Sequence, residues 1–190
     1  MSANPFFEAW TTPFEIPPFD RIETGHFREA YDVALAAHKA EIAAIINDPA
    51  KPDFENTIVA MERAGEALKR VGSVFWNLAG TESTEALRAV EREMSPLLAR
   101  HYSEIFLDPT LFARVDAVFE ARAQAAYSPE QLRVLERKHK AFIRAGAKLG
   151  EAQRQRLGAI TEELATLGTR FSQNVLKDES GFVLVLDKEA

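Results

Sequence analysis

Residues 151–176 read EAQRQRLGAITEELATLGTRFSQNVL, and this stretch decides the fold. Its apolar side chains recur at intervals of three and four residues. That spacing marks one face of an α-helix and is close to a heptad seam. The residues on this face are Leu157, Ile160, Leu164, Leu167, Phe171 and Val175. The stretch therefore predicts one long helix with a continuous apolar face.

Five further segments show the same spacing and predict helices over 24–46, 56–80, 87–105, 109–119 and 129–145. The last two begin at clear start signals, Asp108-Pro109 and the capping box from Ser128 to Gln131. Pro96 predicts a kink or break near Ser95, because a proline inside a helix removes a backbone hydrogen bond. We expect an all-α fold, an antiparallel bundle of about six helices with short loops.

The two ends of the chain differ from the helical middle. Residues 1–23 combine dense proline with aromatic side chains, as in Pro17-Pro18-Phe19, which predicts an extended arm packed on the bundle. A polyproline ligand segment is the alternative interpretation of the arm. Near the other end, a turn over 178–181 leads into FVLVL at 182–186, which predicts a lone strand.

A lone strand lacks ladder partners and is not stable by itself. We therefore expect the chain to be the amino-terminal part of a longer protein. The predicted organisation is an arm over 1–23, a helical domain over 24–177, and over 178–190 the start of a strand that leads into the missing remainder.

Composition argues against several classes of function. The 190 residues are 46% hydrophobic and 27% charged, with a net charge of −6 and no cysteine, so disulfides and thiolate sites are excluded. Basic residues are scattered among acidic ones, whereas a nucleic-acid surface needs a concentrated basic face. No apolar run has the length of a membrane span, and no signal peptide follows Met1. We expect a cytoplasmic protein with no nucleic-acid or membrane partner.

Motifs that carry chemistry are weak in this chain. It contains no His-Glu-x-x-His, no glycine-rich phosphate loop and no nucleophile elbow. Glu-x-x-His occurs twice, from Glu23 to His26 and from Glu136 to His139, and paired motifs of this kind hold di-iron centres in some bundles. Because Glu23 precedes the predicted helix, this pair fails the required geometry. We interpret His139 as a core histidine.

Two sets of charged residues are further candidate sites. Acidic residues cluster in the first helix and could support acid–base chemistry in a suitable pocket, whereas basic residues of the sixth helix could bind an anion. These residues are Glu23, Glu29, Asp32 and Glu41, and Lys148, Arg154, Arg156 and Arg170. We interpret both groups as solvated helix faces. No catalytic, cofactor-binding or metal-binding residue is predicted.

Several segments, in order along the chain, resemble the bacterial peptidyl-dipeptidases (dipeptidyl carboxypeptidases) of the thimet oligopeptidase and oligopeptidase A family of zinc metallopeptidases. The similarity covers essentially the whole chain and is strongest in the sixth helix. The segments are 4–7, 17–20, 26–27, 52–58, 61–62, 145–149, 164–167 and 171–176.

The resemblance implies that the chain is the amino-terminal helical domain of a hydrolase that removes dipeptides from the carboxyl end of short peptides. In this family the zinc-binding His-Glu-x-x-His helix lies far toward the carboxyl end, so this chain would hold no cofactor and the parent enzyme would hold zinc. The domain would form one wall of a channel that limits substrates to short peptides. Its partner would be the missing catalytic part of the same chain.

An alternative from a different class remains open at this stage. The chain could be a stand-alone helical interaction module without enzymatic activity. If the chain is instead part of a longer enzyme, we expect the surface and strand edge exposed by the missing part to allow artificial self-association of the fragment.

Overall fold

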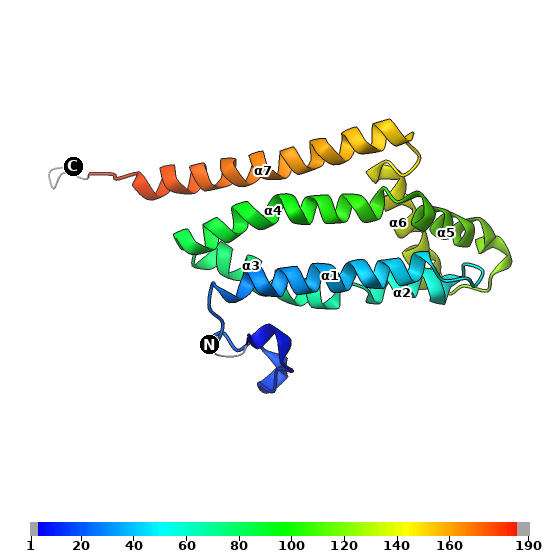
Figure 1. Cartoon of the computed structure of the whole chain (residues 1–190), viewed down its shortest axis with the longest axis horizontal. Coiled ribbons are helices and arrows are strands. Elements are labelled where there is room, and N and C mark those ends of the chain that lie inside the picture. Colours follow the sequence, from blue (N-terminus) through cyan, green and yellow to red (C-terminus); the bar gives the residue numbers. More distant parts are fainter. Residues whose placement is uncertain (1–3, 186–190) are drawn as a thin grey trace.

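Helices make up most of residues 4–185, the part of the chain that the computed structural model describes (Figure 1). Six of them have 12 or more residues, and a short α2 has 4. The helices are α1 His26–Ile46, α2 Ala60–Arg63, α3 Glu66–Thr81, α4 Glu85–Phe106, α5 Pro109–Glu120, α6 Pro129–Ala145 and α7 Glu151–Gly181. The predicted all-α fold with about six helices is confirmed.

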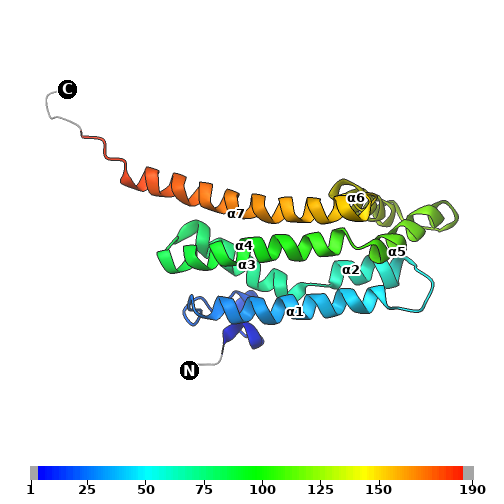
Figure 2. The same ribbon diagram turned by 45° about the horizontal axis from the view of Figure 1, so that its top comes forward.

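The long helices are stacked in layers. Figure 1 shows α7 lying along α4 with the opposite chain direction, and α1 and α3 forming the next layer. The arm of residues 4–23 lies against the side of α1 that faces away from α4, and α5 and α6 close one end of the stack. The turned view in Figure 2 shows the same order, with α7 on the outside.

The buried side chains form two hydrophobic cores that share no residue. The first core joins the arm, the first half of α1, α3 and the first half of α4, with Phe27 and Phe75 at its centre. The second joins the end of α1, residues 54–61, the end of α4, α5 and α6, with Leu111 and Phe142 at its centre. α1 and α4 run through both cores.

Two helix starts were predicted correctly because their signals are local. The Asp108 carboxylate accepts a hydrogen bond from the Leu111 backbone N–H at 2.7 Å, which caps α5. Ser128 and Gln131 form the predicted capping box of α6, each side chain accepting from the other's backbone N–H.

The helix predicted over 56–80 is wrong as a single element. The chain forms a π-helix at Phe54–Val59, continues as α2, and then breaks at Ala64 and Gly65 before α3. Gly65 has φ of +79°, which an L-residue adopts only with strain. A Cβ atom at Gly65 would lie 2.9 Å from the His38 ring of α1. The close contact with α1 therefore favours glycine at the break.

Pro96 does not break α4. The helix is continuous from Glu85 to Phe106, and the Ser95 hydroxyl donates to the Glu91 carbonyl at 2.8 Å one turn earlier. Of the kink or break predicted near Ser95, the break is therefore wrong, and the kink stays a prediction. The hydrogen bond that Pro96 cannot donate is still missing from the middle of α4.

The predicted turn and strand near the carboxyl end are also not formed. α7 continues through residues 178–181 and ends at Gly181. Phe182 is extended (φ −74°, ψ 126°), and the described residues 182–185 form no strand. A lone extended segment has no ladder to join, which explains the difference. Leu186, the last residue of the predicted strand, lies outside the described residues.

The arm contacts the first core through its aromatic side chains. Phe6 is buried, and its ring lies 5.4 Å from the ring of Phe27, measured between centroids. The Arg70 guanidinium of α3 lies 3.7 Å from the ring centroid of Trp10, a cation–π contact. Phe14, in contrast, is 96% exposed.

Among the helices of residues 4–185, none combines the length and apolar character that a membrane span requires.

Candidate functional site

The two Glu-x-x-His motifs lie apart and serve local structure. The His26 ring accepts a hydrogen bond from the Glu23 backbone N–H at 3.0 Å, at the start of α1. The His139 ring, in α6, lies 2.8 Å from a carboxylate oxygen of Asp116 and stacks on Phe119 at a centroid distance of 3.8 Å. Among the residues that the structure describes, no three histidine, aspartate or glutamate side chains converge as metal ligands.

The candidate carboxylates of the first helix do not meet either. Glu29 accepts a hydrogen bond from the Asn4 side chain at 3.2 Å, and Glu41 accepts one from the Gly65 backbone N–H at 2.7 Å. Glu23 and Asp32 are exposed. Each carboxylate therefore lies in a different environment, and the two that are bonded stabilise the arm and the α2–α3 break.

The basic candidates on the sixth predicted helix do not form one anion site. Arg154 donates to the Leu149 carbonyl at 2.7 Å and lies 3.8 Å from Glu151. Lys148, Arg156 and Arg170 are exposed. These contacts hold the start of α7 rather than gathering positive charge around a ligand.

The most chemically varied cavity opens where α2 breaks from α3. It has a volume of about 550 Å³ and lies between α1, the break, α4 and the middle of α6. The charged and polar side chains in its lining are His38, Glu62, Arg63, Glu66, Lys69, Tyr102 and Lys138. The charges in this lining are mixed, so the cavity shows no preference for one sign of ligand.

His38, which lines this cavity, belongs to a buried histidine pair. His101 Nε2 of α4 and His38 Nδ1 of α1 are 2.9 Å apart, and the two side chains are 2% and 8% exposed. Burial, reinforced by the neighbouring His38 and Lys39, lowers the pKa of His101 to about 4. Burial also lowers the pKa of His38, against the opposing effect of Glu41. Both rings are therefore neutral at pH 7.

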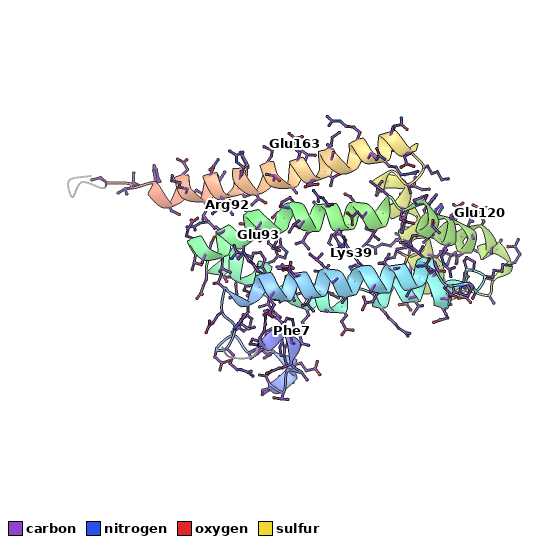
Figure 3. All side chains as sticks on the ribbon, viewed as in Figure 1. Phe7, Lys39, Arg92, Glu93, Glu120 and Glu163 are labelled. Atoms are coloured by element: carbon purple, nitrogen blue, oxygen red, sulfur yellow. The ribbon has the colours of Figure 1, made fainter. Side chains whose placement is uncertain are left out.

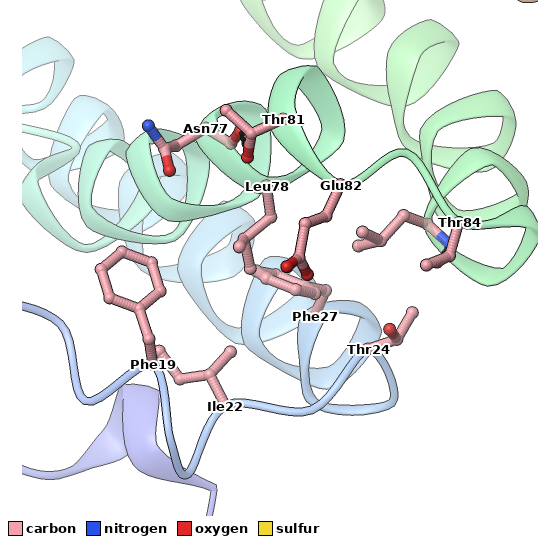
Figure 4. A pocket seen from close by; sticks show the side chains of 10 residues that line it. Phe19, Ile22, Thr24, Phe27, Asn77, Leu78, Thr81, Glu82 and Thr84 are labelled. Atoms are coloured by element: carbon pink, nitrogen blue, oxygen red, sulfur yellow. Dashed lines mark hydrogen bonds between the residues drawn. The ribbon is translucent and has the colours of Figure 1, made fainter.

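A second pocket lies between the arm and the end of α3 (Figure 4). Phe19 and Ile22 of the arm face Leu78 of α3 across it, and Glu82 reaches into it from the end of α3. Within the described chain, Glu82 is the one titratable side chain that lines this pocket. A single carboxylate among apolar and hydroxyl groups offers no acid–base pair.

α7 carries a row of exposed apolar side chains at helical spacing. We call it the α7 stripe and define it as Leu164, Leu167, Phe171 and Val175, which are 61%, 49%, 71% and 39% exposed. These residues have the helical spacing on which the helix was predicted. None of the 31 residues of α7 is fully buried. This part of its apolar face is therefore exposed, whereas Leu157 and Ile160, nearer the start of the helix, are half-buried.

α7 packs on α4 through a different face, which is small and polar. The half-buried residues on this side include Thr161, Ala165, Thr169 and Gln173. Gln173 donates to Glu91 at 2.6 Å and accepts from Arg92 at 2.7 Å. Figure 3 shows Arg92 directed from α4 toward α7, and Glu163 on the outer side of α7. Polar contacts therefore hold α7, and its apolar stripe stays free.

Sequence reasoning missed two of these features for different reasons. The His38–His101 pair joins residues 63 positions apart, so no local pattern could reveal it. The α7 stripe was recognised as an apolar face, but the sequence could not show that α4 would take the polar face instead. The isolated Gly65 inside a helical pattern was the available signal for the break.

Comparison with known proteins gives a consistent result. No family model matches the chain. It is 40% identical to the dipeptidyl carboxypeptidase of Escherichia coli over 185 residues, which is 97% of this chain and 27% of the relative. It is 38% identical to the dipeptidyl carboxypeptidase of Salmonella typhimurium, covering 98% of this chain and 28% of the relative. The oligopeptidase A of Haemophilus influenzae is 26% identical over 175 residues, 92% of this chain and 26% of the relative.

Over nearly its whole length, the chain is therefore similar to part of the dipeptidyl carboxypeptidases and, at lower identity, of the oligopeptidases A. The resemblance predicted from the sequence is confirmed. The chain spans just over a quarter of the length of its dipeptidyl carboxypeptidase relatives, 27% and 28%. Most of the length of these relatives therefore has no counterpart among these 190 residues.

Proposed function

We propose that this chain is the amino-terminal helical domain of a zinc-dependent peptidyl-dipeptidase, where it forms one wall of a channel that admits short peptides. The observation that carries the proposal is 40% identity to a dipeptidyl carboxypeptidase over 97% of the chain. The domain would supply shape and a packing surface to the parent enzyme, and the remainder of the parent would supply the zinc and the catalytic residues.

The degree of similarity favours the dipeptidyl carboxypeptidase branch. The two dipeptidyl carboxypeptidases are 40% and 38% identical to the chain, whereas the oligopeptidases A of Haemophilus influenzae and Escherichia coli are 26% and 25% identical. We therefore propose release of dipeptides from the carboxyl end of short peptides rather than internal cleavage. We also propose a cytoplasmic location, in line with a relative named a probable cytosolic oligopeptidase A.

The state of the histidines supports a non-catalytic role for this part of the enzyme. His38 and His101 bond to each other, His139 bonds to Asp116, and His26 accepts from the backbone at the start of α1. A metal centre needs several ligands gathered at one point, and no three such side chains converge among the described residues. We therefore assign no catalytic, cofactor-binding or metal-binding residue to this chain.

The α7 stripe is the surface that we assign to the rest of the parent enzyme. Phe171 and Leu164 are 71% and 61% exposed, and contiguous exposed apolar surface commonly marks an interaction site. Each large apolar side chain contributes about 1.5–3 kcal/mol when it becomes fully buried. The long unmatched part of the relatives provides a partner of sufficient size.

A chimeric enzyme tests the proposed function. In the chimera, this chain replaces the aligned 185 residues of the Escherichia coli dipeptidyl carboxypeptidase. We expect it to release dipeptides from the carboxyl end of a short peptide and to lose activity when a chelator removes zinc. The matched control carries Phe171→Asp, which places a charge in the α7 stripe and should weaken assembly.

A chimera that folds and binds zinc but cleaves no peptide would contradict the proposal. Internal cleavage without dipeptide release would contradict the assignment to the dipeptidyl carboxypeptidase branch.

A further inference from the structure

The two hydrophobic cores meet at a polar layer. α1 contributes Ala34 to the first core and Ile42 to the second, and His38 lies between them. α4 contributes Met94 to the first core, and His101 follows before the helix reaches the second. A directional hydrogen bond between the two rings, at 2.9 Å, replaces apolar packing at this level. The cores are therefore joined here by one specific contact.

The backbone is interrupted at the same level. Gly65, directly against the His38 ring, separates α2 from α3 and has φ of +79°. Pro96 removes one hydrogen bond from α4 between the first core and His101. The cavity of about 550 Å³ opens at this layer, so space for movement is already present. The segment between α2 and α3, and α4, are thus weakened near the level where the histidines meet, whereas α1 and α7 pass this level as continuous helices.

The surroundings of His101 define the protonation of the pair. His101 Nδ1 is buried and has no hydrogen-bond partner within the described chain. A buried N–H without an acceptor is costlier than a bare nitrogen, so the proton of neutral His101 lies on Nε2 and is donated to His38 Nδ1. A second proton on His101 would have to occupy the unpartnered Nδ1. Protonation of both rings would place two N–H groups against each other.

Other charged or titratable groups face the layer from each neighbouring element, and their charges are balanced. They are Lys39 and Glu41 from α1, Tyr102 and Glu104 from α4, Glu62, Arg63, Glu66 and Lys69 from both sides of the break, and Lys138 from α6. Lys39 pairs with Glu104 at 3.0 Å, and Lys138 pairs with Glu62 at 2.5 Å. None of these pairs offers an acceptor to His101 Nδ1.

We propose that the layer of His38, Gly65 and His101 is a hinge, and that the neutral histidine pair holds it closed. The hinge joins a first body, packed around the first core, to a second body, packed around the second core. Acidification then favours an open form in which both rings reach water. This inference concerns the 190 residues themselves and does not depend on the proposed peptidase function. With a pKa of about 4 for His101 when closed and an ordinary value near 6.5 when open, the ratio of open to closed chains rises about thirtyfold at pH 5.

Distance measurements between two spin labels test the hinge. The chain has no cysteine, so Glu82→Cys and Glu120→Cys, at exposed positions on the two bodies, are the sole labelling sites. We expect a narrow distance distribution at pH 7.5 and a second population at pH 5. The matched control, Asp32→Cys with Glu82→Cys, has both labels on the first body and should remain narrow at both pH values.

A second variant separates the histidines from the carboxylates. His38→Gln with His101→Gln keeps two side chains that can hydrogen-bond to each other but do not titrate, and leaves every carboxylate in place. Labelled at positions 82 and 120, it should show the same distribution at pH 7.5 and pH 5. The proposal is overturned if the original pair gives no second population at pH 5, if the glutamine variant responds equally, or if the control pair broadens to the same extent.

Discussion

α1 and α7 are both long amphipathic helices, but only α1 finds a partner for its apolar face. α1 has 21 residues and buries seven of them, including Phe27 at 1% and Tyr31 at 0% exposure. α7 has 31 residues and buries none, and its Phe171 is 71% exposed. The difference shows that an apolar repeat determines a helix but not its partner. α1 is stabilised by packing within the chain, whereas α7 depends on helix propensity and polar contacts with α4.

Truncation of one phenylalanine in each region should give the largest contrast. Phe75 of α3 is fully buried against Phe27 and Tyr31 of α1, so Phe75→Ala should lower the free energy of unfolding by about 3–5 kcal/mol. Phe171→Ala on the α7 stripe should change it by less than about 0.5 kcal/mol. Urea unfolding of both variants measures this. Equal losses would show that α7 is packed as well as α1.

Substitution of glycine by alanine should have opposite signs in the two regions. Gly65→Ala places a Cβ atom 2.9 Å from the His38 ring at a φ of +79°, so it should destabilise the chain by about 1–3 kcal/mol. Gly168 lies inside α7 with no atom near its Cβ position, and Gly168→Ala should stabilise the helix by about 0.5–1 kcal/mol. Thermal unfolding of the two variants and the unchanged chain measures both changes in stability. Loss of stability in Gly168→Ala would mean that this face of α7 is covered.

Acid should destabilise the part of the chain around α1 through the histidine pair. Burial lowers the pKa of His101 to about 4, below the ordinary value near 6.5, so the unfolded chain binds more protons than the folded chain between these values. The contribution of His101 to stability is complete above pH 6.5 and is lost as the pH falls toward 4. The expected loss is about 2 kcal/mol at pH 5, which corresponds to the thirtyfold change given above. Urea unfolding against pH measures it, with His38→Gln/His101→Gln as the variant that should lack this slope.

The isolated chain should neither hold zinc nor cleave peptides. Its histidines are bonded elsewhere in the fold, as described above, and no ligand set for zinc is gathered among the described residues. Metal analysis after dialysis and a peptide-cleavage assay check this expectation. Stoichiometric zinc together with cleavage that a chelator abolishes would contradict it.

Local signals predicted much of the fold, and long-range contacts account for what was missed. The starts of α5 and α6 follow from Asp108 and Ser128, because a cap involves only three or four neighbouring residues. The break at Gly65 depends on His38 in another helix, so the sequence pattern extended falsely from 56 to 80. The same reasoning holds for α7, whose apolar repeat predicted the helix correctly but could not predict which face α4 would contact.

For the candidate site residues, too, local signals were readable from the sequence and long-range contacts were not. The sequence correctly separated Glu23–His26 from a helical metal motif, because a residue before the helix start cannot share its face. It could not bring His38 to His101, since only the folded chain places the middle of α1 beside α4.

Hydrogen exchange of α7 amides tests most directly the claim that its apolar stripe packs against the rest of a longer enzyme. The measurement compares residues 164–176 in the isolated chain and in the chimera with the Escherichia coli relative, with α1 as the internal reference. We expect protection of these amides to rise at least about tenfold in the chimera, while protection of the buried part of α1 stays unchanged. Equal protection of α7 in both proteins would contradict the account.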